Sequence, residues 1–262
     1  MFCAKFFYFI LRTEDMLCSD ILREVLLWVD PADLPACRAA CSAWRAVLGD
    51  LWYWRERCAR EGVPACGDAP TDWQSHYLLT ARRRNLVANP SGEDGMRHWV
   101  ENSVESGFYA NVMGVTDFTM PPGASSYFSS WNKYCMIRQR VDLVARGYSP
   151  ALMDAIQPAV EVQVWHSAPL RDVWCDYFVR FRVLDARRRA LAEKEMRVCL
   201  WKRRDGTWSC VRHVFRQYGP SARYVEISHM VSAYNKTRMG LYSGVGVSRN
   251  SVEVVSPWAV RR

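Results

Sequence analysis

The sequence has 262 residues, of which 50% are hydrophobic and 24% are charged, as in ordinary globular proteins of one sandwich-sized domain plus a small appendage. The net charge of +8 would suit a phosphate-rich partner only if it were clustered. The two arginine runs, residues 82–84 and 187–189, fall at an expected helix end and an expected hairpin turn, so we expect solvated arginines and no nucleic acid.

Ten cysteines are scattered along the chain without a CxxC pair, and none of the five histidines clusters with a cysteine. Zinc sites need such clusters, so we expect no metal and no other cofactor. Unpaired thiols at irregular spacing indicate a reducing compartment, and we expect a cytoplasmic protein.

The chain begins with an apolar stretch, MFCAKFFYFIL, interrupted by Lys5. It is too short to span a bilayer, and no small-residue cleavage site follows it. We treat residues 1–14 as a leader of unknown role. The alternative interpretation, a targeting segment, would be needed for a surface receptor.

Three short helices are predicted next. Ser19 or Asp20 caps the first, which the Asp30-Pro31 pair ends, because proline disfavours helical geometry in the residue before it. The second runs from Leu34 to Leu48, and the third covers residues 51–60, with Gly62 as a left-handed stop. A unit this small buries little apolar area, so we expect contact with a partner or with the neighbouring domain to stabilise it.

The hydrophobic period changes near Asn85, from helical spacing to alternation. Strands are predicted at 108–113, 135–143, 160–165, 175–183, 191–198, 208–215, 223–229 and 251–255. Asp205-Gly206 is a two-residue hairpin signal, and Ser149 caps a helical insertion that Pro158 ends. Many short strands at such spacing favour a β-sandwich.

The predicted fold class is therefore α+β: a small N-terminal three-helix module joined by a helical linker to an antiparallel, jelly-roll-like β-sandwich. We expect the module at 15–62, the linker and helix at 63–84, the sandwich at 85–258 and a basic tail at 259–262.

Catalytic signatures such as GxSxG, the phosphate-binding loop, GxGxxG and HExxH are absent from the sequence. Glu161, Asp176 and Glu195 fall on predicted strands as single solvent-face charges, without an acid-base pair. We therefore expect no enzymatic activity of the chain itself.

Two ordered sets of residues resemble known families. The first is Leu17-Cys18-Ser19-Asp20-Ile21-Leu22-Arg23-Glu24-Val25-Leu26, then Asp30-Pro31, Leu34, Cys37-Arg38, Cys41, Trp44-Arg45 and Leu51-Trp52, which resembles an F-box. Cys18 stands where that family usually has proline. The second is Arg84-Asn85-Leu86, Asn89-Pro90, Gln139, Val141-Asp142-Leu143, Gly147-Tyr148, Leu152-Met153-Asp154, Gln157-Pro158, Val164-Trp165, Phe215 and Tyr218-Gly219-Pro220, which resembles the F-box-associated (FBA) domain.

The resemblance implies a non-catalytic substrate receptor of an SCF-type cullin ubiquitin ligase that docks the Skp adaptor and presents a client for ubiquitination. Some similar proteins bind the chitobiose of high-mannose N-glycans on misfolded glycoproteins in ER-associated degradation, and non-specific cytotoxic cell receptor proteins share the domain. The alternative is a stand-alone lectin-like or protein-binding module.

The F-box resemblance implies adaptor contacts at eight residues: Leu17, Ile21, Leu22, Val25, Leu26, Pro31, Leu34 and Trp44. The alternative is that several of them form a closed miniature core. The client or glycan site is expected on end loops, at Trp131, Asn132, Lys133, Tyr234, Lys236, Arg238, Met239 and Tyr242. Arg238 and Met239 occupy the place of the Tyr-Trp pair of glycan-binding members, and Trp131 and Tyr242 could instead pack at the core edge.

Overall fold

The computed structural model describes residues 19–31, 33–65, 69–81, 83–101, 107–112, 119–130, 132–168, 170, 174–200, 206–234 and 244–259. The leader lies outside these residues. The chain divides into two compact units after Ala81, and each is considered by itself. No helix among the described residues is long and apolar enough to span a membrane.

The first unit is helical. Its elements are α2 (Ser19–Leu27), α3 (Leu34–Ala40), α4 (Ser42–Gly49), α5 (Leu51–Arg60) and α6 (Trp73–Ala81). The second predicted helix is two helices, because Cys41 is extended, with φ −156° and ψ 173°. The sequence spacing does not reveal this break, since Cys37 and Trp44 on either side of it both remain buried.

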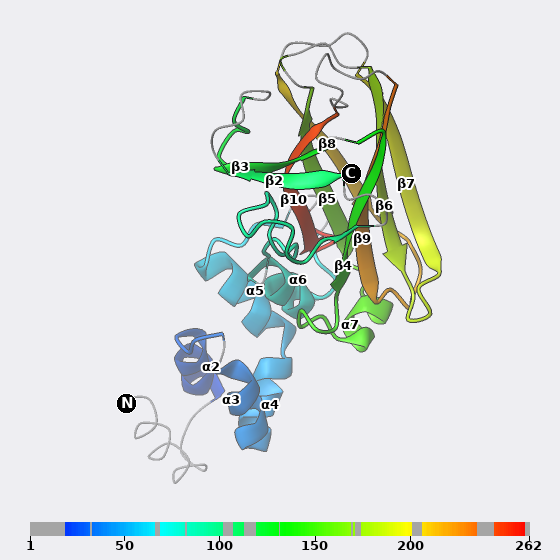
Figure 1. The fold of residues 1–262 in the computed structure, drawn as a ribbon. Coiled ribbons are helices and arrows are strands. Elements are labelled where there is room, and N and C mark those ends of the chain that lie inside the picture. Colours follow the sequence, from blue (N-terminus) through cyan, green and yellow to red (C-terminus); the bar gives the residue numbers. More distant parts are fainter. Residues whose placement is uncertain are drawn as a thin grey trace. The chain divides into compact units, whose positions relative to one another are not determined.

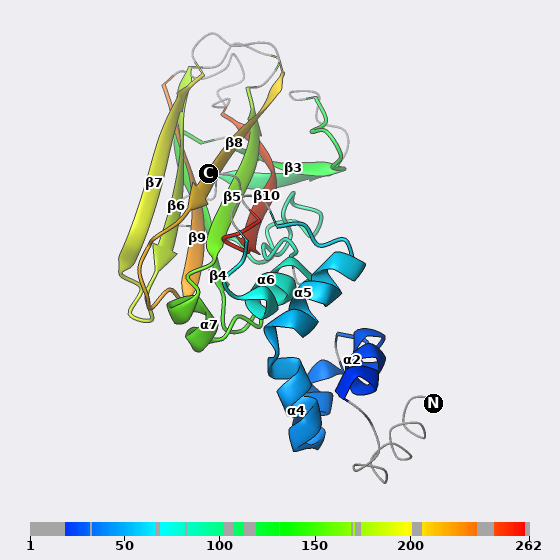
Figure 2. The ribbon, with the colours of Figure 1, turned by 180° about the vertical axis from the view of Figure 1, so that it is seen from behind.

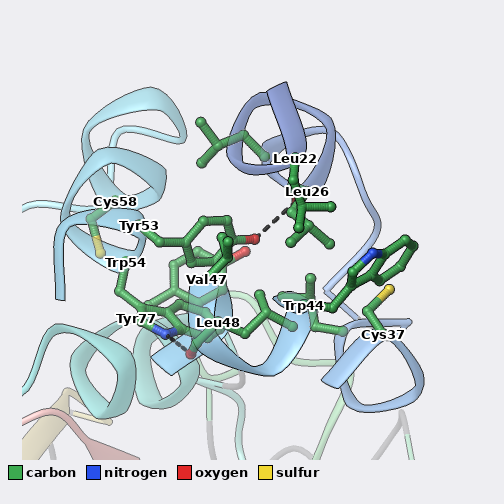
Figure 3. Packing of buried hydrophobic residues seen from close by; sticks show 12 residues of the cluster. Leu22, Leu26, Cys37, Trp44, Val47, Leu48, Tyr53, Trp54, Cys58 and Tyr77 are labelled. Carbon is green, nitrogen blue, oxygen red and sulfur yellow. Dashed lines mark hydrogen bonds between the residues drawn. The ribbon is translucent and has the colours of Figure 1, made fainter. Parts of the chain in front are cut away.

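A closed core lies inside the helical unit. Figure 3 shows Leu22 and Leu26 of α2 turned toward Tyr53 of α5, and Tyr77 of α6 belongs to the same cluster. The Tyr53 hydroxyl donates a hydrogen bond to the Leu26 carbonyl at 2.9 Å. The Trp54 indole N–H donates to the Leu48 carbonyl, also at 2.9 Å. The helix predicted as part of a linker therefore contributes a side chain to this core.

The second unit is a two-sheet β-sandwich, as predicted (Figures 1 and 2). Its strands are β1 (Val100–Glu101), β2 (Phe108–Val112), β3 (Ser126–Ser130), β4 (Tyr134–Asp142), β5 (Ala159–Ser167), β6 (Cys175–Leu184), β7 (Ala190–Cys199), β8 (Trp208–Phe215), β9 (Tyr224–Ala233) and β10 (Gly246–Val255). Sheet A has the order β1-β4-β9-β6-β7 and sheet B the order β2-β3-β10-β5-β8, and all pairings are antiparallel.

Alternating side chains build the core between the sheets. In β6, Tyr177, Val179 and Phe181 are fully buried, while Arg180 between them faces outward and is partly exposed. The helical insertion is α7 (Pro150–Ala155), where the Ser149 hydroxyl accepts a hydrogen bond from the Leu152 N–H at 3.2 Å. Both the strand pattern and this cap confirm the sequence predictions.

The hairpin predicted at Asp205-Gly206 is wrong. β7 pairs with β6 in sheet A, whereas β8 pairs with β5 in sheet B, so the connection crosses from one sheet to the other. The dipeptide signals a left-handed turn residue, and Gly206 does have φ +62°. A turn residue does not by itself specify that the flanking strands pair.

A buried histidine lies in the core of the sandwich. His229 of β9 is fully buried, and its Nδ1 is 2.8 Å from the Tyr177 hydroxyl oxygen. Burial, together with a smaller effect of the nearby His166, lowers the pKa of His229 to about 3, and a hydrogen bond with Asn250 opposes this only in part. His229 therefore stays neutral in the folded sandwich throughout the mildly acidic range.

This histidine should make the sandwich sensitive to acid. Below the ordinary pKa of 6.5 the unfolded chain takes up a proton that the folded chain does not. The free energy of unfolding then falls by about 1.4 kcal/mol per pH unit until the folded pKa is reached. We expect His229→Gln to remove that slope between pH 6 and pH 4, measured by hydrogen exchange of β9 amides. If the free energies of unfolding of wild type and variant differed by the same amount at pH 6 and at pH 4, the expectation would be contradicted.

Candidate functional site

Three residues of the predicted client site belong to the described part of the chain, and they lie at one end of sheet A: Asn132, Lys133 and Tyr234. Lys133 leads into β4 and Tyr234 follows β9. The Ala233 N–H donates to the Lys133 carbonyl at 2.8 Å, and the Tyr234 N–H donates to the Trp174 carbonyl at 2.7 Å. Residues far apart in sequence thus converge at this end through main-chain hydrogen bonds.

Two aromatic side chains are exposed at this end. Tyr134 is 62% exposed and Tyr234 is 47% exposed. The Lys133 ammonium lies 5.3 Å from the centroid of the Tyr134 ring, and Asn132 is partly buried in the same loop. Exposed rings beside amide and ammonium donors can pack against the C–H face of a sugar or against a protein side chain. We call Asn132, Lys133, Tyr134 and Tyr234 the loop-end cluster.

A buried carboxylate holds one of these rings in place. Asp176 of β6 is 1% exposed, and its Oδ2 accepts hydrogen bonds from the Tyr234 hydroxyl at 2.6 Å and from Arg197 at 2.5 Å. Burial alone would raise the pKa of Asp176, but hydrogen bonds from Arg197, Tyr234 and Cys199 outweigh it and lower the pKa. Asp176 is therefore an anion that orients Tyr234 before any ligand arrives.

The prediction of single solvent-face carboxylates is wrong for two residues. Asp176 is buried as described above. Glu161 is 8% exposed and pairs with Arg212 at 2.6 Å and Arg83 at 3.5 Å. Both carboxylates lie on outward-facing strand positions, but long arginine side chains cover them.

Sequence reasoning missed several residues near the loop-end cluster. Tyr134 immediately follows the predicted Trp131-Asn132-Lys133 segment, so an aromatic residue next to a predicted binding loop could have been included in the site. Asp176 and Arg197 lie on different strands and give no local signal that they meet. Five predicted residues lie outside the described part of the chain: Trp131, Lys236, Arg238, Met239 and Tyr242.

The predicted adaptor residues divide into buried and accessible ones. Four belong to the closed core of the helical unit (Figure 3), with little exposure: Leu22 (4%), Leu26 (0%), Leu34 (4%) and Trp44 (4%). Their burial favours the alternative prediction, in which they form a closed miniature core, and adaptor contact by them stays a prediction. Ile21 is 52% exposed, Val25 and Pro31 are partly exposed, and Leu17 lies outside the described residues. Adaptor contact by Ile21, Val25 and Pro31 stays a prediction.

An apolar stripe runs along the outer face of α2. Ile21 and Val25 lie four residues apart on one face of α2, and Trp28 follows three residues later, in the turn directly after the helix. Trp28 is 73% exposed, and the Arg60 guanidinium carbon lies 3.6 Å from its ring centroid. The Trp28 indole also donates to Glu24 at 3.1 Å. We call Ile21, Val25 and Trp28 the α2 stripe.

Arg57 of α5 connects the helices from inside the module. Its guanidinium is buried and donates to the Leu26 carbonyl at 3.1 Å and to the Val29 carbonyl at 2.8 Å. It also donates to the Tyr53 and Tyr77 hydroxyls at 3.0 and 3.1 Å. Burial alone would lower the pKa of Arg57, but hydrogen bonds with Tyr53 and Tyr77 raise it. One cation thereby satisfies the carbonyls at the end of α2.

The chain thus has two modules: a small helical unit with exposed apolar side chains, and an antiparallel sandwich with exposed rings at its loop end. The family model described as "F-box domain" matches residues 15–56, and the model described as "F-box associated region" matches residues 77–254. The chain belongs to the F-box associated region family and carries an F-box domain ahead of that region.

Several curated proteins are similar to this chain over most of its length. "F-box only protein 2" of Bos taurus is 33% identical over 225 residues, covering 82% of this chain and 75% of that protein. "F-box only protein 6" of Bos taurus is 33% identical over 226 residues, covering 82% and 83%. "F-box only protein 44" of Homo sapiens is 30% identical, covering 80% and 85%. A solved structure of TmCBM61 in complex with beta-1,4-galactotriose covers 64% of this chain and 97% of its own, at 11% identity and a TM-score of 0.44.

Proposed function

We propose that this chain is the substrate-recognition subunit of an SCF-type cullin ubiquitin ligase. In this proposal the helical module docks the Skp adaptor, and the sandwich binds a protein client for ubiquitination and degradation. The chain supplies proximity and no chemistry of its own, because holding client and ligase together makes the transfer effectively intramolecular.

The observation that carries the proposal is an F-box domain with large apolar side chains exposed on and directly after its first described helix. Its own core already buries Leu22 and Leu26, yet Ile21 of the same helix is 52% exposed, and Trp28, directly after the helix, is 73% exposed. Large exposed apolar side chains on one face of a helix are typical of protein interfaces. The F-box identity of residues 15–56 supports the Skp adaptor as the partner.

Complex formation tests the adaptor half of the proposal. The full chain is mixed with purified Skp adaptor and analysed by size-exclusion chromatography with light scattering. A one-to-one complex is expected, and separate elution of the two proteins at micromolar concentration would contradict it. That outcome would favour the second candidate, a stand-alone lectin-like or protein-binding module, which the closed core of the helical unit also permits.

For the client half, we propose that the loop-end cluster is the binding site and that an N-glycosylated, misfolded protein is the client. The support is the pair of exposed rings, Tyr134 and Tyr234, one of them oriented by Asp176. A ring fixed before binding loses little side-chain freedom when a ligand packs against it.

A glycan array with chitobiose-containing oligosaccharides tests the site. We expect the double change Tyr134→Ala with Tyr234→Ala to weaken binding about 10-fold or more, because each ring that packs on a ligand contributes about 1 kcal/mol. The matched control is Tyr109→Ala, which removes a ring that is 48% exposed on β2. If the control lost as much affinity as the double variant, the binding site would lie elsewhere. If the wild type bound no glycan on the array, the client would be recognised through its protein surface.

A further inference from the structure

The arginine run at residues 187–189 has no part in the proposed function. It forms the exposed turn between β6 and β7. The Asp185 carboxylate accepts the N–H groups of Arg187 and Arg189 at 2.8 and 2.9 Å, and it also pairs with the Arg189 side chain at 2.8 Å. Arg189 is therefore neutralised. Arg187 and Arg188 make no side-chain ion pair with any described residue.

Neighbouring turns bring further arginines to the same end of the sandwich. The Arg223 N–H donates to the Leu184 carbonyl at 2.8 Å, and the Leu143 N–H donates to the Arg223 carbonyl at 3.0 Å. These bonds place the turns that follow β4, β6 and β8 side by side. Arg223 is paired with Asp154 at 2.8 Å.

Arg146, in the turn after β4, is exposed, and its carbonyl accepts a hydrogen bond from the exposed Arg84 at 3.0 Å. Neither has a carboxylate partner among the described residues. The carboxylate of Asp142, the last residue of β4, accepts the Ala145 N–H at 3.0 Å. We call Arg84, Arg146, Arg187 and Arg188 the basic end.

The backbone of Arg188 gives a second reason to single out this turn. Its φ is +65°, in the left-handed region that glycine adopts without steric cost. A side chain at this position makes the turn less stable than glycine would. The strain brings a cationic side chain to the tip of the turn, and strained residues of this kind concentrate at functional positions.

We propose that the basic end is a docking surface for an acidic segment of a protein. Guanidinium groups form paired hydrogen bonds with carboxylates, and four of them here lack an internal carboxylate. Val144, 44% exposed in the same turn as Arg146, adds an apolar contact that suits a polypeptide. The turns at 143–149, 185–189 and 216–223 carry no exposed aromatic ring for stacking on nucleic-acid bases.

The basic end lies far from the loop-end cluster. β4 runs from Tyr134 at the loop end to Asp142 beside the basic end, and eight strand steps span about 27 Å. An acidic segment bound at the basic end would therefore not cover the exposed rings of Tyr134 and Tyr234. The sandwich can hold two ligands at once.

Fluorescence anisotropy with the full chain tests the proposal. The probe is a labelled twelve-residue peptide of alternating Glu and Leu, and Arg146→Ser with Arg187→Ser and Arg188→Gly is the variant. We expect at least a 10-fold loss of affinity, and weaker binding of the wild type as salt is raised. A second probe in which Gln replaces Glu should not bind. Arg188→Gly alone should weaken binding several-fold while Tm stays the same or rises, which separates loss of contact from loss of folding.

A matched variant removes the same charge elsewhere on the sandwich: Arg97→Ser with Arg138→Ser and Lys194→Ser. This control should bind the peptide like the wild type. Equal loss in both triple variants would show that net charge alone attracts the probe and would overturn the proposal. Tighter binding of a labelled dT20 oligonucleotide than of the acidic peptide, or no peptide binding by the wild type, would overturn it as well.

Discussion

Replacing Ile21 by Asp and Trp28 by Ser should reduce the affinity of the chain for the Skp adaptor by 100-fold or more. Both side chains belong to the α2 stripe and are exposed, so the change removes contact surface and leaves the core of the module in place. Central apolar residues of an interface commonly contribute about 2 kcal/mol each, and two of them account for about three orders of magnitude. Isothermal titration calorimetry with purified adaptor measures the effect.

The matched control for this variant is Val100→Asp. Val100 of β1 is 53% exposed, close to the 52% of Ile21. The control substitution therefore places an aspartate at an apolar position of similar exposure. The control should bind the adaptor with wild-type affinity. Wild-type affinity of the Ile21→Asp, Trp28→Ser variant would exclude the α2 stripe as the docking face, whatever the control does.

Replacing Arg57 by Met should lower the free energy of unfolding of the helical unit by about 3–5 kcal/mol. The change takes the Arg57 donor from the Val29 carbonyl and leaves the Leu26 carbonyl with the Tyr53 hydroxyl as its side-chain donor. The Tyr53 and Tyr77 hydroxyls lose the same guanidinium partner. A small helical module has little stability to spare, so this loss suffices to unfold it. Hydrogen exchange of α2 and α5 amides measures the unit separately from the sandwich.

The control on the same helix is Arg55→Met. Arg55 is exposed, and its guanidinium carbon lies 5.1 Å from the Trp52 ring centroid. Exposed contacts of this kind contribute less than about 1 kcal/mol, so protection of the α2 amides should stay nearly unchanged. If Arg57→Met left the exchange of α2 amides at the wild-type rate, Arg57 would not be the connection between α2 and α5.

Much of the sandwich could be predicted because alternation survives in the long strands. Buried and partly exposed side chains alternate along β4 and through the middle of β6, so their period is visible in one sequence. β3 was not predicted, since all five of its residues, SYFSS, are buried and three of them are serine. β1 has two residues and shows no period at all.

The candidate site was predictable only where it is local in sequence. Asn132 and Lys133 could be found as a loop segment, and Tyr234 as an aromatic in a later loop. That Asp176 is buried beneath Tyr234 depends on the pairing of β6 with β9, a contact between residues 58 positions apart. The burial of Leu22 and Leu26 likewise depends on which helices pack against α2. The spacing of apolar residues in the sequence does not specify this packing.

The order of the strands has a consequence for synthesis of the chain. The two middle strands, β9 and β10, are the last two to be made, and each pairs with strands on both sides. Sheet A cannot close until Ala233 has been made and sheet B until Val255 has been made, whereas the helical unit is complete at Ala81. At 5–20 residues per second, the nascent chain presents a finished F-box for roughly ten to thirty seconds before its sandwich exists. The helical unit can therefore fold before the synthesis of the sandwich is complete.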